Sequence, residues 1–393
     1  AEQATLSLAK NFAARSMPGI LDRYILSMFL GVLGITFTSL AGLFVLIDLT
    51  NNIDEFVTYG AEDGFGVLWQ YYGPRVLQFF DRLGPVIVLL SSIFAITRLM
   101  KTNELVAIMA AGVSKGRVIK PLLWAALVVS VISVVNRECW IPAVREQLTR
   151  NAQDWRGNRP NPLRPTYDYK TDIFLGGKQS VAAERKILQA QFRLPPALTS
   201  GFGQQLLAES AKYDQASAEH PAGYLLDNVS SPADLSGIAS AAQNNQPLIL
   251  SPKDHAWLGP KQCFVVSDVT FEQLSGGSLW RSLSSSRELI AALRNPSLDL
   301  GNETRVMVHA RIVQPFLDLT LLVLGLPLVI KRDNRNIFVA SGMCLGLVAV
   351  FLVTVMACHA LGSSYLLSPA LGAWLPLFIF TPAAYTAVVP LWR

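Results

Sequence analysis

The sequence contains few charged residues, which excludes an ordinary soluble fold for much of the chain. Only 16% of its 393 residues are charged and 51% are apolar, whereas a soluble domain carries about 25% charge. The mean hydropathy is +0.36. We therefore expect a lipid bilayer to surround part of the chain.

Residues that build metal, disulfide and nucleotide sites are also scarce. The four cysteines form no CxxC pair, and the four histidines are scattered along the chain. These patterns disfavour a zinc site and a disulfide framework. The P-loop pattern GxxxxGK[ST] is missing, as is GxGxxG after a strand. We expect no bound cofactor, no nucleic-acid partner and no nucleotide hydrolysis by this chain.

Six apolar runs are long enough to cross a bilayer, which takes roughly 20 residues. They cover residues 24–47, 76–97, 121–136, 306–330, 337–360 and 369–392. Pro121 suits the first turn of the third run. Residues 1–20 do not resemble a signal peptide, because the apolar run that follows them is too long. The pattern predicts helices one to three within 21–141, an insert at 142–303 and helices four to six within 304–393.

Basic residues gather on one side of these spans. Lys and Arg occur before the first span, between spans two and three, between spans four and five, and at the C-terminus. Residues 48–74 contain no Lys or Arg but five acids. Because basic loops stay on the cytoplasmic side, residues 1–20 and the C-terminus are expected in the cytoplasm. The insert is expected outside it.

The insert reads as β-structure. Short half-apolar segments separated by Gly, Pro, Asn and Ser are typical of an all-β sandwich or roll. The candidate strands are 171–176, 187–194, 206–213, 222–229, 247–251 and 262–269. Ser285 and Glu288 fit a capping box, so a short helix is expected to follow the strands.

A short helix is predicted at about 102–112, between spans two and three. Asn103 can cap its start and Gly112 can end it. Its one acid, Glu104, lies in the first turn, where the helix dipole favours a negative charge. Glu104 either serves only this capping role or binds an arginine of a cytoplasmic partner.

The fourth span contains three polar residues on one face. Arg311, Gln314 and Asp318 follow the spacing i, i+3, i+7. Ionisable groups within a span usually face a bundle interior or a cavity. They either stabilise helix packing through an Arg–Asp contact or line a substrate cavity.

Several segments resemble the LptF/LptG permease family, the membrane subunits of the lipopolysaccharide-export ABC transporter. They are LDRYI (21–25), SLAGLFVLID (39–48), NELVAIMAAGVS (103–114), QPF (314–316) and LSPALGAWLP (367–376). The resemblance implies a six-helix integral membrane protein of the bacterial inner membrane with an inserted periplasmic β-jelly-roll-like domain. It implies a permease that extracts lipopolysaccharide or a related glycolipid and passes it to a periplasmic bridge.

The same resemblance implies partners and roles. A second LptF/LptG-type permease would complete a hetero- or homodimer, with a cavity bounded by helices one and five. An LptB-like ATPase dimer, which uses ATP and Mg, would bind the helix at 102–112, where Glu104 stands at the coupling carboxylate. LptC- and LptA-like β-proteins would receive the lipid. Some family members carry basic residues that contact lipid phosphates at positions that here hold Val45, Asn51 and Asn52. Either the partner permease supplies these basic contacts, or the transported glycolipid carries fewer phosphates.

Two other functions are compatible with the layout. A membrane-bound enzyme could use the insert as a catalytic domain acting on envelope lipid or glycan, but the insert has no spacing of acid, base and nucleophile that requires it. A non-transporting anchor could hold a β-module, but it would not need the amphipathic segment at 102–112 or the polar residues of span four.

Overall fold

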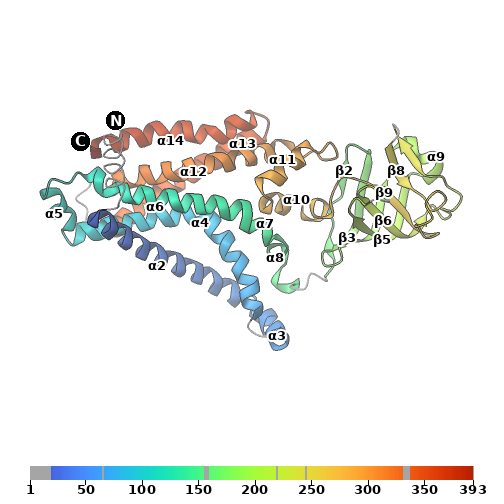
Figure 1. Cartoon of the computed structure of the whole chain (residues 1–393), viewed down its shortest axis with the longest axis horizontal. Coiled ribbons are helices and arrows are strands. Elements are labelled where there is room, and N and C mark those ends of the chain that lie inside the picture. The colour runs from blue at the N-terminus through green and yellow to red at the C-terminus, as the bar shows by residue number, and fades with distance from the viewer. Residues whose placement is uncertain are drawn as a thin grey trace, which may run out of the picture. The chain divides into compact units, whose positions relative to one another are not determined.

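The computed structural model describes residues 19–63, 66–154, 159–217, 220–243, 246–330 and 337–392. The chain divides into two compact units. Unit 1 comprises residues 1–51, 75–140 and 305–393, and unit 2 comprises 52–74 and 141–304. Figure 1 shows long helices in the first and the β-strands in the second. Residues 1–18, 331–336 and 393 lie outside the described part, including most of the predicted N-terminal segment and several basic loop residues.

Six helices in the described part of the chain are long and apolar enough to cross a membrane. This confirms the six predicted spans. The helices are α2 (Ile20–Asn51), α4 (Gly66–Lys101), α6 (Lys115–Val135), α12 (Gly301–Ile330), α13 (Ile337–Ser363) and α14 (Pro369–Trp392). The prediction for Pro121 is wrong, because α6 begins six residues earlier and Pro121 lies inside it. Ser114 caps α6 instead, accepting a hydrogen bond from the Arg117 backbone N–H.

The described residues of the acidic stretch at 48–74 are mostly helical and do not form a loop. The last residues of α2, the whole of α3 (Ile53–Asp63) and the start of α4 occupy it. Acids interrupt the apolar positions of this stretch, so its apolar runs are too short to be predicted as a membrane span. Phe56 packs edge-on against Tyr71 with ring centroids 5.0 Å apart, and this aromatic contact within unit 2 holds α3 against α4.

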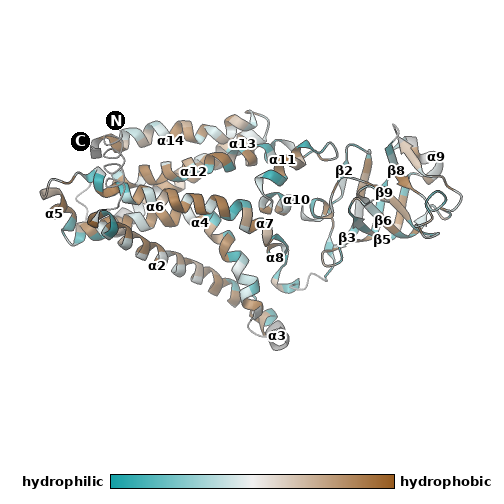
Figure 2. Cartoon of the chain, in the orientation of Figure 1, coloured by the Kyte–Doolittle hydropathy of each residue, from teal (hydrophilic) through white to brown (hydrophobic). Residues whose placement is uncertain are grey.

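The core of unit 1 is built by α4, α6 and α12. About half or more of the most apolar stretch of each is buried: 61%, 50% and 50%. The corresponding shares are only 6% for α2, 22% for α13 and 28% for α14. Figure 2 shows apolar residues along these less buried helices. Their apolar surfaces require lipid or another protein as their surroundings, because water would make such exposure costly.

Unit 2 contains one antiparallel sheet of nine strands, with the path β1-β3-β4-β5-β6-β9-β8-β7 and β2 also paired with β3. The strands are β1 (Asn161–Pro162), β2 (Thr166–Asp168), β3 (Ile173–Val181), β4 (Lys186–Arg193), β5 (Gln205–Asp214), β6 (Gly223–Ser231), β7 (Ala241–Gln243), β8 (Gln246–Leu250) and β9 (Cys263–Val266). All six predicted strands are present. The expected inserted β-domain is confirmed as an antiparallel sheet domain.

The inner face of the sheet carries the core of unit 2. Phe192, Tyr224 and Leu226 are fully buried there. Gly223 permits the pairing of β6 with β9, since a Cβ at this position would lie 2.2 Å from the Val265 carbonyl oxygen. Cys263 is buried and free, so apolar packing rather than a disulfide stabilises this domain.

Short helices connect the sheet with the long helices. The predicted capping box of Ser285 and Glu288 starts α11 (Ser286–Arg294). A second box, made by Thr270 and Gln273, starts the unpredicted α10 (Phe271–Leu283). The remaining short elements are the π-helix η1 (Asn136–Trp140), α7 (Ile141–Ala143), α8 (Arg145–Thr149), η2 (Ala152–Asp154), η3 (Pro196–Leu198) and α9 (Thr199–Phe202).

Candidate functional site

The predicted short helix is α5 (Glu104–Ala110), which lies between α4 and α6. Asn103 does not cap it through its side chain, so that prediction is wrong. Asn103 instead adopts a left-handed backbone with φ 57°, a conformation that asparagine tolerates better than most residues. This conformation turns the chain sharply from α4 into α5. The helix ends at Ala110, and Gly112 follows with φ 83°.

The carboxylate of Glu104 binds the first turns of α2. Tyr24 donates its hydroxyl hydrogen to Glu104 Oε2 over 2.6 Å. The distance is typical of an O–H group that binds a carboxylate. This hydrogen bond, followed by one from Thr102, lowers the pKa of the Glu104 carboxyl. Glu104 is therefore ionised at neutral pH, and the contact persists on acidification until the pH passes through this lowered pKa.

A second contact joins α2 to α6. Arg117, in the first turn of α6, lies 3.0 Å from Asp22 of α2. The backbone N–H of Gly19 also donates to Asp22. The first turn of α2 is thus connected both to α5 and to α6. Figure 1 shows that the start of α2, α5 and the end of α14 lie at one end of the unit 1 helices.

The surface of α5 has a buried side and an open side. Leu105 is buried, and Ile108 and Met109 pack against the core of unit 1. Val106 is 53% exposed, and Ala107 and Ala110 are exposed as well. The open side is therefore apolar and flat, and Glu104 is only partly exposed beside it. Such a surface suits a groove of a partner protein.

Of the three polar residues of α12, Gln314 and Asp318 are in contact, while Arg311 lies near an acid outside this helix. Gln314 donates to Asp318 over 2.7 Å. Arg311 lies 3.9 Å from Glu138, which belongs to the π-helix that follows α6. Arg137, next to Glu138, binds Asp81 of α4 through two contacts of 2.9 and 3.2 Å. These groups form a polar cluster within the bundle of unit 1.

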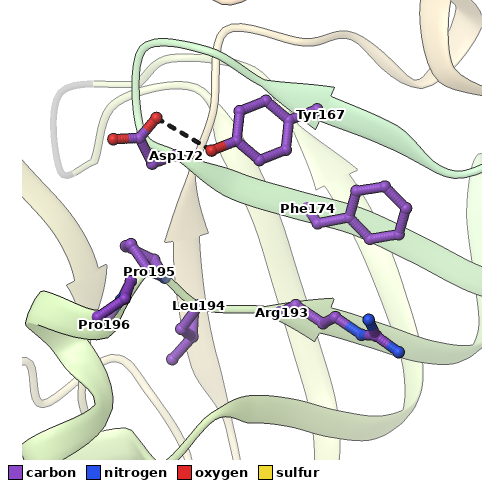
Figure 3. A pocket seen from close by; sticks show the side chains of 7 residues that line it. All are labelled: Tyr167, Asp172, Phe174, Arg193, Leu194, Pro195 and Pro196. Atoms are coloured by element: carbon purple, nitrogen blue, oxygen red, sulfur yellow. Dashed lines mark hydrogen bonds between the residues drawn. The ribbon is translucent and has the colours of Figure 1, made fainter.

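The sheet of unit 2 carries an open cleft of about 480 Å³. Tyr167 of β2, Phe174 of β3 and Arg193 of β4 are consecutive cross-strand partners that line it. Figure 3 shows these side chains on one side of the strands, with Pro195 and Pro196 at the end of β4. The Tyr167 hydroxyl donates to Asp172 over 3.1 Å. The cleft therefore offers aromatic rings, a guanidinium and a carboxylate to a polar ligand.

The three positions where the resemblance expects basic residues carry no charged side chain. Val45 is partly buried in α2, and Asn51 ends that helix. Asn52 accepts a hydrogen bond from the Gln153 side chain over 3.1 Å. In the described residues, no group of three His, Cys, Asp or Glu side chains could hold a metal ion.

A comparison with family models decides the assignment. The model described as "Lipopolysaccharide export system permease LptF/LptG" matches residues 23–388. The chain belongs to the LptF/LptG family. A search of curated proteins gave no match. The matched range includes most of α2 and α14, the other four long helices, α5 and the inserted sheet, and it contains both Tyr24 and Glu104.

LptF/LptG permeases are non-catalytic transmembrane subunits of an ABC transporter. This chain is accordingly a multi-pass membrane protein of a lipopolysaccharide export system and not a membrane-bound enzyme. Family membership also means that it acts in a transporter complex. The sequence reasoning identified Glu104 but missed Tyr24, its partner 80 positions away. The signal was present, because the LDRYI segment contains both Asp22 and Tyr24.

Proposed function

We propose that this permease extracts lipopolysaccharide or a related glycolipid from the bacterial inner membrane and passes it to a periplasmic β-jelly-roll bridge toward the outer membrane. The observation that carries the proposal is the LptF/LptG match over residues 23–388. The arrangement of three long helices, an inserted antiparallel sheet and three more long helices supports it.

Extraction of such a lipid requires an energy source outside this chain. Each CH₂ group that leaves the bilayer costs about 0.8 kcal/mol, so a lipid with several acyl chains is held tightly. The sequence has no P-loop. We assign ATP and Mg to a separate LptB-like ATPase dimer in the cytoplasm, and no cofactor to the permease itself.

The ATPase is proposed to dock on α5. Its open side, formed by Val106, Ala107 and Ala110, supplies apolar contact area. Glu104 has two roles in this proposal: it faces the partner beside this surface, and it holds Tyr24. A displacement of α5 by the ATPase is thereby transmitted to α2, the first span. The contact between Asp22 and Arg117 transmits the same displacement through α6.

The lipid cavity is proposed to form between this chain and a second LptF/LptG-type permease. Of all spans, α2 has the smallest buried share, 6%, and α13 has the next smallest, 22%. These are helices one and five, which the family resemblance assigns to the cavity. The apolar surface left open on them suits acyl chains and the facing permease.

The sheet of unit 2 is proposed to receive the lipid on the periplasmic side and to hand it to LptC- and LptA-like proteins. Phe192, Tyr224 and Leu226 fill its inner face. Acyl chains can enter only if such side chains move apart, and the apolar lining then replaces the bilayer as their environment. In this proposal the two permeases and the β-proteins all shield the acyl chains from water.

The test is reconstitution of the permease pair with its ATPase in liposomes, with Glu104→Lys as the variant. The charge reversal removes the acceptor for Tyr24 and places a cation at the docking surface. We expect membrane insertion to persist and ATP-dependent lipid release to an added β-jelly-roll acceptor to fall by about 2- to 30-fold. Glu184→Lys, an exposed position in a β-turn, is the matched control. Equal release by both variants, or no ATP-dependent release by the wild type, would contradict the proposal.

A further inference from the structure

A small cavity lies inside unit 1 between α4, α6 and α12. Its volume is about 10 Å³, which is close to the minimum for one water molecule. Ser130 and Ser133 of α6, Asp318 of α12 and Gly84 of α4 are among its lining residues. The lining is thus polar on two sides, although the surrounding helices are apolar.

Ser130 has an unmet hydrogen-bonding capacity at this cavity. The residue is 5% exposed, and its hydroxyl has no hydrogen-bond partner among the described residues. A buried hydroxyl without a partner is destabilising, because it has given up its hydrogen bonds to water. Ser133 is also buried, and its hydroxyl faces Gly84, where a Cβ would lie 3.6 Å from Ser133 Oγ. A small ligand in the cavity would satisfy the Ser130 oxygen.

The acids near the cavity differ in their partners. Arg137 is bound to Asp81, and Arg311 lies near Glu138. Asp318 accepts its hydrogen bond from the neutral amide of Gln314, while Arg137 and Asp81 act on it with opposite sign. Two of these three acids thus lie against an arginine, whereas Asp318 lies against a neutral amide. Within a membrane a carboxylate with a neutral partner is costly.

We propose that Asp318, Ser130 and Ser133 form a binding site for one small monovalent cation, either a sodium ion or a proton. One carboxylate and two neutral hydroxyls provide the charge and the oxygen ligands that such a cation needs. A sodium ion fits a space the size of a water molecule. A proton resides on the carboxyl group, whose O–H then donates to a serine oxygen.

Multivalent cations do not suit this site. Only one of its three ligand groups is charged, and hard divalent ions select sites with more ligands and more negative charge. In the described part of the chain, no group of three His, Cys, Asp or Glu side chains is available. Because the site joins α4, α6 and α12, its occupancy strengthens the packing of the central bundle. This inference concerns the permease alone and does not depend on the proposed lipid transport.

The test uses the purified full-length chain in lipid nanodiscs at neutral pH. Thermal unfolding is measured in sodium chloride and in choline chloride of equal ionic strength, for the wild type, Asp318→Asn and Ser130→Ala. Infrared difference spectra of the same samples report whether a buried carboxyl is protonated. Asp54→Asn, which neutralises an exposed acid of α3, is the matched control.

Two results support the site and identify its cation. If sodium binds, sodium raises the unfolding temperature of the wild type and of Asp54→Asn but not that of Asp318→Asn. In Ser130→Ala, half of the temperature increase then requires a severalfold higher sodium concentration than in the wild type. If a proton binds, sodium has no effect, and the wild type shows a protonated carboxyl band that disappears in Asp318→Asn and shifts in Ser130→Ala.

The proposal would be overturned if Asp318 is ionised and sodium does not change the unfolding temperature of the wild type. The cavity would then hold only water. If Asp318→Asn does not fold, the comparison of wild type with Ser130→Ala decides. Ser130→Ala removes no hydrogen bond present in the structure, so its folding is expected to be unimpaired. An unchanged sodium response and an unchanged carboxyl band in this variant would equally refute the site.

Discussion

At the scale of single residues, function depends on contacts between distant positions. Glu104 follows directly from the sequence, because an acid in the first turn of a short helix flanked by basic residues is easily recognised. Tyr24 does not, since it lies 80 positions away and its hydroxyl meets Glu104 only after α2, α4 and α5 have packed. The prediction for Asn103 failed for a related reason. Asn103 has a left-handed backbone conformation, whereas a residue that caps a helix through its side chain normally has an extended one.

The Tyr24 hydroxyl is expected to couple α5 to α2. Tyr24→Phe removes only the donor to Glu104 and keeps the aromatic ring. Lipid-stimulated ATP hydrolysis by the reconstituted complex should decrease by about 2- to 30-fold, while copurification of the ATPase persists because the open side of α5 is intact. Tyr365→Phe, an exposed position, is the control. Full activity of Tyr24→Phe would show that the hydrogen bond has no role in coupling.

At the scale of elements, the sequence predicts those helices and strands that have a long apolar run or a regular alternation of apolar and polar residues. Apolar runs of 16 to 25 residues gave the six spans, and alternation in segments such as 206–213 gave strands close to β5. Elements of two or three residues, such as β1, β2 and β7, were missed because they have no periodicity of their own. The unpredicted α10 had a visible signal in Thr270 and Gln273, the residues of its capping box.

Close packing of α13 and α14 depends on two glycines. A Cβ at Gly372 would lie 2.7 Å from the Gly362 Cα and 3.0 Å from the Cys358 carbonyl oxygen. Both neighbours are backbone atoms, so Gly372→Ala must push the helices apart, at a cost of about 1–3 kcal/mol. We expect a lower unfolding temperature of the purified chain.

Gly346→Ala is the matched control for this prediction. It also lies in α13, but a Cβ at Gly346 meets no heavy atom within 4 Å. Its unfolding temperature should remain at or above that of the wild type, because alanine is the better helix former. Equal destabilisation by the two substitutions would disprove the role of close helix contact.

At the scale of the whole molecule, the sequence predicted the order of parts but not their detailed chemistry. The uneven distribution of Lys and Arg suggested which helix ends face the cytoplasm. The polar cluster of α12 could be predicted as one face of a helix. The sequence could not predict that Arg311 lies near Glu138 of the π-helix, or that Asp318 and Ser130 line one cavity. Both features depend on how α4, α6 and α12 pack.

The central claim is that α5 faces an ATPase in the cytoplasm while the sheet receives lipid in the periplasm. Single-cysteine labelling in intact bacteria tests it most directly, with Cys139→Ser as the parent chain. Cys139 is exposed, whereas the other three cysteines are buried, and burial raises the pKa of the Cys263 thiol to about 12, which suppresses its reactivity. The probes are Lys212→Cys in β5 and Ala107→Cys in α5, both at exposed positions.

A maleimide that cannot cross the inner membrane should label Lys212→Cys in intact cells. It should label Ala107→Cys only after the inner membrane has been opened. The reverse pattern, with Ala107→Cys labelled from outside and Lys212→Cys protected, would contradict the export function proposed for this permease.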